Sequence, residues 1–480
     1  MKPTQHCSSL QRMSRIAAIW SVTALPGCVI GPTDQTVYEG QPATFNAIAG
    51  PGEGAVSFQW LRDGTAIPVN GTSDRFTTLP TTLYDDGAAF QVMITDARGT
   101  ATSNPATLSL RPAFDVNPSQ MSAATHTFIP ADDPKYAYVG RIDYKDPSAP
   151  VLIWSGTTVR ARFHGKSLGV KLNSLNGSSY FNVIVDGEIR MLRAVDSGSA
   201  VYRWNGSLAD IDHELVIFKR TEAMFSYAAF QGLFIDRGQR ALRPRPPALP
   251  RKIEFYGDSI TAGVCDEVFP YDNDGDTYNP IGYSSHNNYT AYGAITARNI
   301  DAEYVAIACS GIGISVSWND PTMPDVYDRL YYKFDVGELR QGSNRYDFST
   351  ERPPDIVVID LGVNDFGRSN FLGNPFPSDY VDRYRTLVQN LRALRPGAAI
   401  VLTLGGLSTG SSNGQAPVLM DAFTTVTRYF KTGATRDPNV YAFVFQATNS
   451  ANPGIHPRDY THQLLANELT RFLKDKHIVP

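Results

Sequence analysis

The 480-residue sequence has few cysteines, little net charge and, beyond its N-terminal segment, no apolar run of about 18 residues that could span a membrane as a helix. Its four cysteines, Cys7, Cys28, Cys265 and Cys309, are scattered and form no CxxC pair, so they lack the spacing of a zinc site. The 43 basic and 47 acidic residues nearly balance, which leaves no overall field to attract nucleic acid or an anionic membrane. We therefore expect no metal, no nucleic-acid partner and a neutral or weakly charged substrate.

The first 28 residues have the pattern of an export signal. Lys2, Arg12 and Arg15 precede the apolar stretch 16–25, which is too short to span a membrane as a mature helix. The tetrapeptide LPGC ending at Cys28 resembles a bacterial lipobox, in which the cysteine is lipidated, although proline at its second position is atypical. Lipidation of Cys28 and ordinary cleavage both stay open. We expect an exported protein that is periplasmic, secreted or lipid-anchored.

A chain of this length predicts several domains, and residues 32–112 are typical of a small β-sandwich. Short alternating runs such as ATFNAIA and AAFQVMITD are separated by turn residues. The segment resembles a bacterial immunoglobulin-like module through EGQPATFNA and the Trp60 of FQWLRDG. It departs from antibody-type domains because Ala47 and Val92 stand where the disulfide cysteines would fall. Trp60 is therefore expected to pack in a core without a disulfide.

A second β-rich region, residues 126–247, follows a Pro-, Ser- and Ala-rich stretch at 113–125 that we interpret as a linker. Runs such as TTVRARFHG, YFNVIVDG and HELVIFKRTE alternate strongly, and their turns contain Gly, Asn and Asp. This pattern predicts a sandwich or jelly roll. The dense prolines of 243–250 then end the region, because they cannot continue a sheet.

From residue 248 to 480 the pattern changes to alternating strands and helices. The candidate strands are apolar and β-branched, as parallel strands buried on both faces are, and amphipathic helices separate them. We therefore expect a multidomain protein that ends in a three-layer α/β sandwich with a parallel sheet. The strands are expected at 252–256, 302–308, 355–362, 398–405 and 439–445.

Four short stretches at strand ends or before the last helix contain the groups that acyl transfer requires. Together they supply a hydroxyl, glycines with accessible amides, a side-chain amide and an imidazole. Taken alone, Ser259 could be either a buried helix cap or a nucleophile, and only the other three stretches favour the nucleophile. The stretches are GDSITAG (257–263), CSGIGIS (309–315), LGVNDF (361–366) and IHPRDYTHQ (455–463).

These stretches, in this order, resemble the sequence blocks of the SGNH, or GDSL, hydrolases. The jelly-roll region joined directly to KIEFYGDSITAG is similar to carbohydrate esterase family 2, whose members deacetylate plant polysaccharides. The resemblance implies that Ser259 is the nucleophile and His456 the general base. It also implies an oxyanion hole formed by the Ser259 and Gly311 amides and the Asn364 side chain, with Gly313 as an alternative to Gly311. No cofactor is implied.

The resemblance further implies an exported esterase that removes O-acetyl groups from an acetylated polysaccharide of the xylan or mannan type. Trp318, shortly after the glycine-rich stretch, is a candidate for stacking on a sugar ring. Two alternatives stay open: a lipase-like or thioesterase hydrolase of the same group, and a non-catalytic glycan-binding or adhesion protein. The acidic stretch 271–280 lacks the glycine and the distant glutamate of a calcium loop and is interpreted as a solvated loop.

One departure from the resemblance concerns the group that orients the histidine. Many relatives have an aspartate three residues before it, whereas this sequence has Pro453. We therefore expect a Ser-His dyad in which a backbone carbonyl orients His456.

If a backbone carbonyl orients His456, Pro453→Asp should give little or no increase in ester turnover, measured as initial rates on 4-nitrophenyl acetate. A large increase in turnover would contradict the carbonyl.

Overall fold

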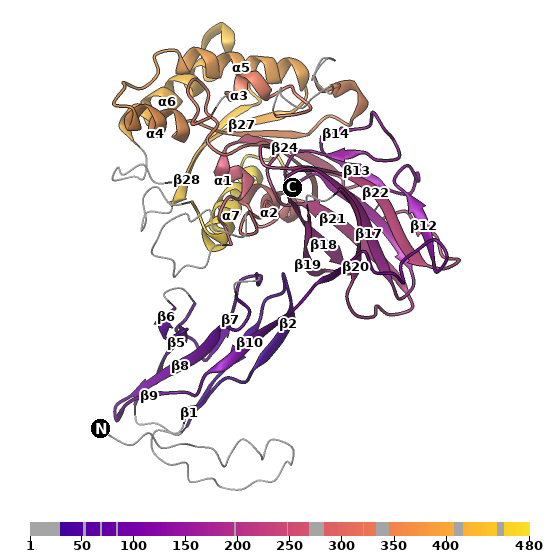
Figure 1. Cartoon of the computed structure of the whole chain (residues 1–480). Helices are drawn as coiled ribbons and strands as arrows, with labels where there is room; N and C mark the ends of the chain where they lie inside the picture. Colours follow the sequence, from indigo (N-terminus) through magenta and orange to yellow (C-terminus); the bar gives the residue numbers. More distant parts are fainter. Residues whose placement is uncertain are drawn as a thin grey trace. The chain divides into compact units, whose positions relative to one another are not determined.

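The computed structural model describes residues 29–50, 54–67, 70–82, 85–195, 198–246, 248–267, 283–319, 321–332, 345–407, 416–448 and 456–480. The contacts among these residues divide the chain into two compact units, one ending at Ala113 and the other beginning at Phe114 (Figure 1). The expected signal with Cys28, the acidic stretch 271–280 and Pro453 lie outside the described residues.

The N-terminal unit is built from short β-strands. They are β1 (Val29–Ile30), β2 (Gln35–Tyr38), β3 (Thr44–Asn46), β4 (Ile48–Ala49), β5 (Ser57–Arg62), β6 (Thr65–Ala66), β7 (Arg75–Thr77), β8 (Ala89–Asp96), β9 (Gly99–Thr102) and β10 (Ala106–Arg111). The main sheet has the order β2-β10-β8-β5-β6, and β9 pairs with β8; β3 pairs with β7 and β1 with β4. Only the β2–β10 pair of the main sheet is parallel.

Aromatic side chains fill the core of this unit. Trp60 is fully buried, and its indole N–H donates to the Ser73 carbonyl at 2.8 Å. Phe45 stacks on Phe90 with 4.4 Å between ring centroids. Ala47 and Val92 are also buried. Apolar packing therefore occupies the positions at which an antibody-type domain would have its disulfide.

The second unit begins with a β-sandwich of two antiparallel sheets. Its strands are β11 (Phe114–Val116), β12 (His126–Pro130), β13 (Ala137–Val139), β14 (Ile142–Asp143), β15 (Val151–Leu152), β16 (Thr158–His164), β17 (Leu168–Asn176), β18 (Ser179–Val185), β19 (Glu188–Ala194), β20 (Gly198–Trp204), β21 (Asp212–Lys219), β22 (Tyr227–Asp236) and β23 (Ala241–Leu242). One sheet has the order β11-β20-β17-β22-β15-β14 with β12 on β22, and the other β13-β16-β21-β18-β19 with β23 on β16.

The stretch 113–125, expected as a linker, takes part in this sandwich. Phe114–Val116 form β11 and pair with β20, and Met121 is buried. A Cβ at Gly169 would lie only 2.6 Å from the Met121 sulfur, so the segment is packed closely against β17. A strand of three residues has too short an alternation to stand out from a Pro- and Ser-rich composition.

The α/β part follows the sandwich and contains one parallel sheet. Its strands are β24 (Arg251–Gly257), β25 (Ala302–Ala308), β26 (Ile356–Asp360), β27 (Ala399–Gly406) and β28 (Val440–Thr448). The order β25-β24-β26-β27-β28 places the first strand between the second and the third, and every pair is parallel. The chain thus leaves β24 toward one side and returns to the other, which makes the carboxyl ends of β24 and β26 a topological switch point.

Helices cover both faces of this sheet, as predicted (Figure 1). They are α1 (Ser259–Ala262), α2 (Tyr292–Asn299), α3 (Met323–Val326), α4 (Val363–Phe371), α5 (Tyr380–Leu394), α6 (Pro417–Lys431) and α7 (Asp459–Asp475), with 3₁₀ turns η3 (Phe348–Thr350) and η4 (Gly433–Thr435). α3, α5 and α6 contribute to the core on one face, and α2 and α7 to the core on the other.

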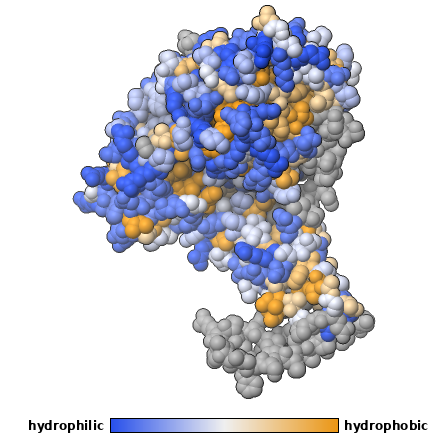
Figure 2. Space-filling view, turned by 180° about the vertical axis from the view of Figure 1, so that it is seen from behind, coloured by the Kyte–Doolittle hydropathy of each residue, from blue (hydrophilic) through white to orange (hydrophobic). Residues whose placement is uncertain are grey.

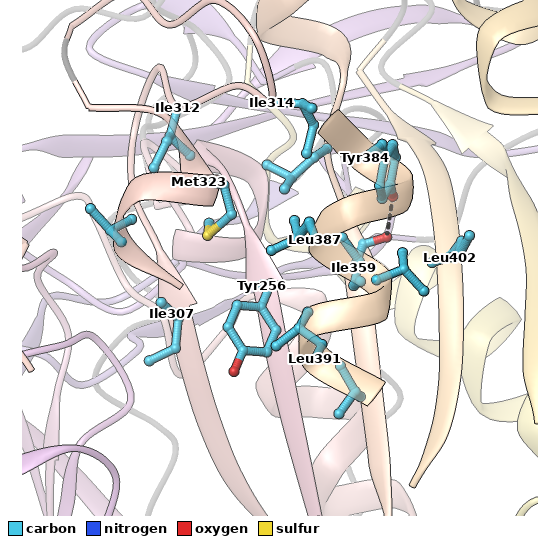
Figure 3. Close-up of a cluster of buried hydrophobic side chains, with 14 of the residues drawn as sticks. Tyr256, Ile307, Ile312, Ile314, Met323, Ile359, Tyr384, Leu387, Leu391 and Leu402 are labelled. Carbon is cyan, nitrogen blue, oxygen red and sulfur yellow. Dashed lines mark hydrogen bonds between the residues drawn. The ribbon is translucent and has the colours of Figure 1, made fainter. Parts of the chain in front are cut away.

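The first of these cores is drawn in Figure 3. Side chains of β24, β25 and β26, including Tyr256, Ile307 and Ile359, face Leu387 and Leu391 of α5. The buried Tyr384 hydroxyl donates to the Ile359 carbonyl at 3.4 Å. On the face shown in Figure 2, by contrast, polar side chains predominate and apolar ones occur in groups among them. This is the usual distribution for a water-exposed surface.

A buried ion cluster joins the sandwich to the parallel sheet. Arg141 of the sandwich lies 3.4 Å from the Glu254 carboxylate and donates to the Tyr256 hydroxyl at 3.0 Å. Arg395, at the end of α5, binds the same carboxylate at 3.1 Å. Burial by itself would raise the pKa of Glu254, but the two arginines outweigh it and lower that pKa.

Replacing Glu254 by alanine should destabilise the protein strongly, because buried Arg141 loses the carboxylate that it contacts and buried Arg395 keeps only its ion pair with Glu351. We expect a loss of about 3–5 kcal/mol, measured by urea unfolding. The matched control is Asp382→Ala, which removes an exposed carboxylate that Arg385 contacts on α5. That change should cost less than about 1 kcal/mol. Equal losses in the two variants would contradict the importance of the buried cluster.

Candidate active site

Ser259 lies at the abrupt turn between β24 and α1. Asp258 is the N-cap of α1, and its carboxylate accepts the Ile260 N–H at 3.0 Å. A Cβ at Gly257 would overlap the Thr261 side chain, so glycine allows α1 to pack this closely against the end of β24. As the first residue of α1, Ser259 has a backbone N–H without a partner inside the helix. The turn thus presents both a hydroxyl and an amide at the switch point.

His456 faces this serine from just before the last helix. Its Nε2 lies 2.7 Å from Ser259 Oγ, within hydrogen-bond distance. Two contacts fix the segment: Arg458 donates to the Cys265 carbonyl at 2.8 Å, and the Asp459 N–H donates to the Asp266 carbonyl at 3.0 Å. The Asp459 carboxylate accepts the neighbouring Tyr460 N–H. The group that orients the other ring nitrogen of His456 stays a prediction.

The loop after β25 contains the two glycines considered for the oxyanion hole. The Gly313 N–H is engaged, since it donates to Ser317 Oγ at 3.0 Å. Among the described residues, the Gly311 N–H has no hydrogen-bond partner, while its carbonyl accepts from Trp318 N–H at 2.8 Å. Of the two amides, Gly311 is thus the one available to a substrate.

Asn364 reaches the same place from the first turn of α4. Its side-chain nitrogen lies 3.1 Å from Asp258 Oδ2 and 2.9 Å from the Ile312 carbonyl. The neighbouring Asp365 is fully buried and accepts the N–H groups of residues 314–316. Asn364 therefore lies beside the turn that contains Ser259, and its side-chain nitrogen has two acceptors there.

Buried carboxyl groups lie close to the turn that contains Ser259. Burial, reinforced by the nearby Asp360, raises the pKa of Asp258 well above its ordinary value. Burial likewise raises the pKa of Asp360 to about 7, although the Tyr292 hydroxyl donates to it at 3.2 Å. Burial lowers the pKa of His462 to about 3, and this histidine accepts the Tyr292 N–H at 3.2 Å. His462 therefore serves the packing of α7.

Trp318 lies beside the loop that contains Gly311 and is 40% exposed. Its ring contacts that of Phe371, which is 69% exposed, at 5.3 Å between centroids, and the Arg368 guanidinium lies 5.3 Å from the centre of the Trp318 ring.

Cys265 and Cys309 are buried and not bonded to each other. Within the described ranges, no cluster of His, Cys, Asp and Glu could hold a metal ion. None of the helices described is long and apolar enough to cross a membrane.

Several supporting residues had not been identified from the sequence. Arg458 lies within the last motif, two residues after His456, so the sequence alone could have identified it as a residue of the site. Glu222 offered no such signal. It belongs to the charged run KRTE at the end of β21, a composition typical of a solvated turn, yet it is fully buried against the loop that contains Gly311.

The fold and the serine–histidine contact are typical of a GDSL-type hydrolase, and the comparisons agree. Residues 255–464 match the GDSL-like lipase/acylhydrolase family, and residues 138–246 match the N-terminal domain of carbohydrate esterase 2. The chain belongs to carbohydrate esterase family 2, a family of carboxylic ester hydrolases. The resemblance stated from the sequence is thereby confirmed.

Individual relatives support this assignment. The chain is 34% identical over 354 residues to a cellulase/esterase, CelE, of Acetivibrio thermocellus, covering 72% of this chain but only 40% of that protein. It is 27% identical to an acetylxylan esterase/glucomannan deacetylase of Cellvibrio japonicus, over 75% of this chain and 93% of the relative. A family two carbohydrate esterase from Clostridium thermocellum, solved with cellohexaose, superimposes with a TM-score of 0.61 at 32% identity, covering 71% of this chain and 99% of that one.

The raised pKa of Asp360 predicts how stability depends on pH. An acid whose pKa is higher in the folded state favours folding at low pH, and this contribution is lost as the pH rises from about 4 to about 7. Asp360→Asn cannot ionise, so its melting temperature should fall less between pH 5 and pH 8 than that of the wild type. Asp382→Asn, on the exposed face of α5, is the control and should keep the wild-type difference. An unchanged difference in Asp360→Asn would contradict the prediction.

Proposed function

We propose that the protein is an exported serine esterase that removes O-acetyl groups from plant polysaccharides of the xylan and mannan type. The observation that carries the proposal is the 2.7 Å contact between Ser259 Oγ and His456 Nε2 at the switch point of the sheet. The contact places a hydroxyl beside a base that can accept its proton. The names of the Cellvibrio relatives support the acetylated polysaccharide as substrate.

In the first half of the proposed reaction, Ser259 Oγ attacks the acetyl carbonyl carbon while His456 Nε2 takes its proton. The carbonyl oxygen becomes an oxyanion in the tetrahedral intermediate. His456 then returns the proton to the sugar oxygen as the C–O bond to the sugar breaks, which leaves an acetyl group on Ser259. The sugar hydroxyl departs as a neutral product.

The oxyanion is expected to be bound by the Ser259 and Gly311 amides and by Asn364. Fixed donors of this kind stabilise the transition state by about 3 to 4 kcal/mol each. Asn364 must exchange an acceptor to take part. Because the raised pKa of Asp258 favours its neutral acid, its bond to the Asn364 amide is weaker than one to a carboxylate. A charged oxyanion is then the better acceptor.

In the second half, water replaces the sugar. His456 takes a proton from the water as its oxygen attacks the acetyl carbon, and the same donors bind the second oxyanion. Collapse of this intermediate returns the proton to Ser259 Oγ and releases acetate. Every step uses groups of this chain and water alone.

We further propose roles for the surrounding parts. Trp318, exposed beside the Gly311 loop, is the candidate for stacking on a sugar ring. The strand order and buried Trp60 of residues 32–112 support an immunoglobulin-like module, and the paired antiparallel sheets support a jelly roll for the region predicted at 126–247. Residues 1–28 are proposed as the export signal, with Cys28 as a candidate lipid anchor site.

The proposal is tested by measuring acetate release from chemically acetylated xylan and glucomannan, with 4-nitrophenyl acetate as a small-ester reference. The wild type should release acetate from at least one polymer. Ser259→Ala should lower kcat by roughly 10⁴-fold or more, because it removes the nucleophile.

Ser349→Ala is the matched control, since Ser349 is exposed in η3 and its hydroxyl donates to Asp347 of the same turn. It should keep the wild-type rate. Activity that survives in Ser259→Ala would contradict the nucleophile. A strong preference for long acyl chains would instead favour a lipase-like enzyme, and glycan binding without any ester hydrolysis would favour a binding protein.

A further inference from the structure

A carboxylate of the β-sandwich contacts the loop that contains Gly311. Glu222 lies between β21 and β22 of the sandwich, and Ser310 follows β25 of the parallel sheet. Glu222 Oε1 accepts the Ser310 hydroxyl at 2.8 Å, and its Oε2 accepts the Ser310 backbone N–H. Glu222 is fully buried. The two bonds therefore form in a dry environment, where hydrogen bonds to a carboxylate are strong.

Ser310 and Gly311 form the middle of a tight turn. The Ile312 N–H donates to the Cys309 carbonyl at 3.3 Å, and Gly311 has a φ of +75°, which favours glycine at the third position of such a turn. The Gly311 N–H belongs to the peptide that joins Ser310 to Gly311. Its direction is consequently set by whatever holds Ser310 on one side and Gly311 on the other.

Each side of this peptide has its own anchor. On the far side, the Gly311 carbonyl accepts the Trp318 N–H at 2.8 Å. At the start of the turn, the Cys309 N–H donates to the Gly257 carbonyl at 3.2 Å, two residues before Ser259. Ser310 itself is held by the two bonds from Glu222. Of these anchors, only Glu222 comes from the sandwich.

We propose that Glu222 is a positioning residue for the esterase reaction, through which the β-sandwich completes the oxyanion hole of the α/β domain. The inference rests on the proposed function. Glu222 acts through Ser310: its two bonds prevent the Ser310–Gly311 peptide from rotating and so keep the Gly311 N–H directed at the oxyanion. The donor acts in the transition state, so its loss lowers kcat and leaves KM nearly unchanged.

Two substitutions separate this role from general stability. Glu222→Ala removes both acceptors, and kcat on 4-nitrophenyl acetate should fall roughly 10- to 100-fold with KM within about twofold. Glu222→Gln should keep kcat within about threefold. Its carboxamide oxygen accepts the Ser310 N–H, and its amide donates to Ser310 Oγ, since a hydroxyl both donates and accepts.

The matched control is Tyr331→Phe. The Tyr331 hydroxyl donates to the Asp143 carboxylate of the sandwich at 2.7 Å, so this variant also removes a hydrogen bond between sandwich and α/β part, but one made by the segment after α3 and not by Ser310 or Gly311. It should keep the wild-type kcat. Folding of each variant is checked by near-UV circular dichroism. If Glu222→Ala does not fold, Ser310→Ala carries the test and should lower kcat about 2- to 10-fold at unchanged KM.

The outcomes are distinct. A folded Glu222→Ala variant with the same kcat as Tyr331→Phe would overturn the inference. A Glu222→Gln variant whose kcat falls as far as that of Glu222→Ala would also overturn it, because the charge of Glu222 and not its hydrogen bonding would then matter. The proposed function is tested separately, by comparing ester hydrolysis by the wild type with that by Ser259→Ala. A wild type without any ester hydrolysis would overturn both.

Discussion

The candidate active site depends on the register of the parallel sheet at the end of β24. Gly257 pairs with Ala308 of β25 on one side and with Asp360 of β26 on the other. Because parallel strands run in the same direction, this register brings the chain after all three strands to one level. The serine, the glycine loop and the asparagine lie in those three continuations. A shift of one residue in either pairing would move its loop by about 3.3 Å, more than the length of a hydrogen bond.

Buried acids surround the serine and act as hydrogen-bond acceptors. Asp258, Asp360 and Asp365 are buried close behind it, and burial raises the pKa of each. Each of these acids accepts a backbone or side-chain donor: Asp258 accepts the Ile260 N–H, Asp360 the Tyr292 hydroxyl, and Asp365 the N–H groups of residues 314–316. The same sheet edge therefore uses buried carboxyl groups as structural acceptors.

How far the sequence determined these conclusions differs from residue to residue. The five strands of the sheet were predicted within a few residues, because parallel strands buried on both faces are continuous apolar runs. Ser259 and His456 were singled out by motifs, and the fold brings them into contact. β11 was missed because three residues carry too little periodicity. The double contact of Asn364, and the burial of Glu222, depend on residues more than 50 positions away in the chain, for which no local pattern exists.

The buried charges between sandwich and sheet also bear on how such a chain can be rearranged in evolution. Arg141, Arg220 and Glu222 of the sandwich are all buried, and their partners include Glu254, Glu267 and Ser310 of the α/β part. A sandwich inherited without this partner would expose an edge of charged side chains, and a new partner would need a complementary set. We therefore expect the sandwich and the α/β part to be inherited together as one unit. The N-terminal unit has its own aromatic core and can be gained or lost as a separate module.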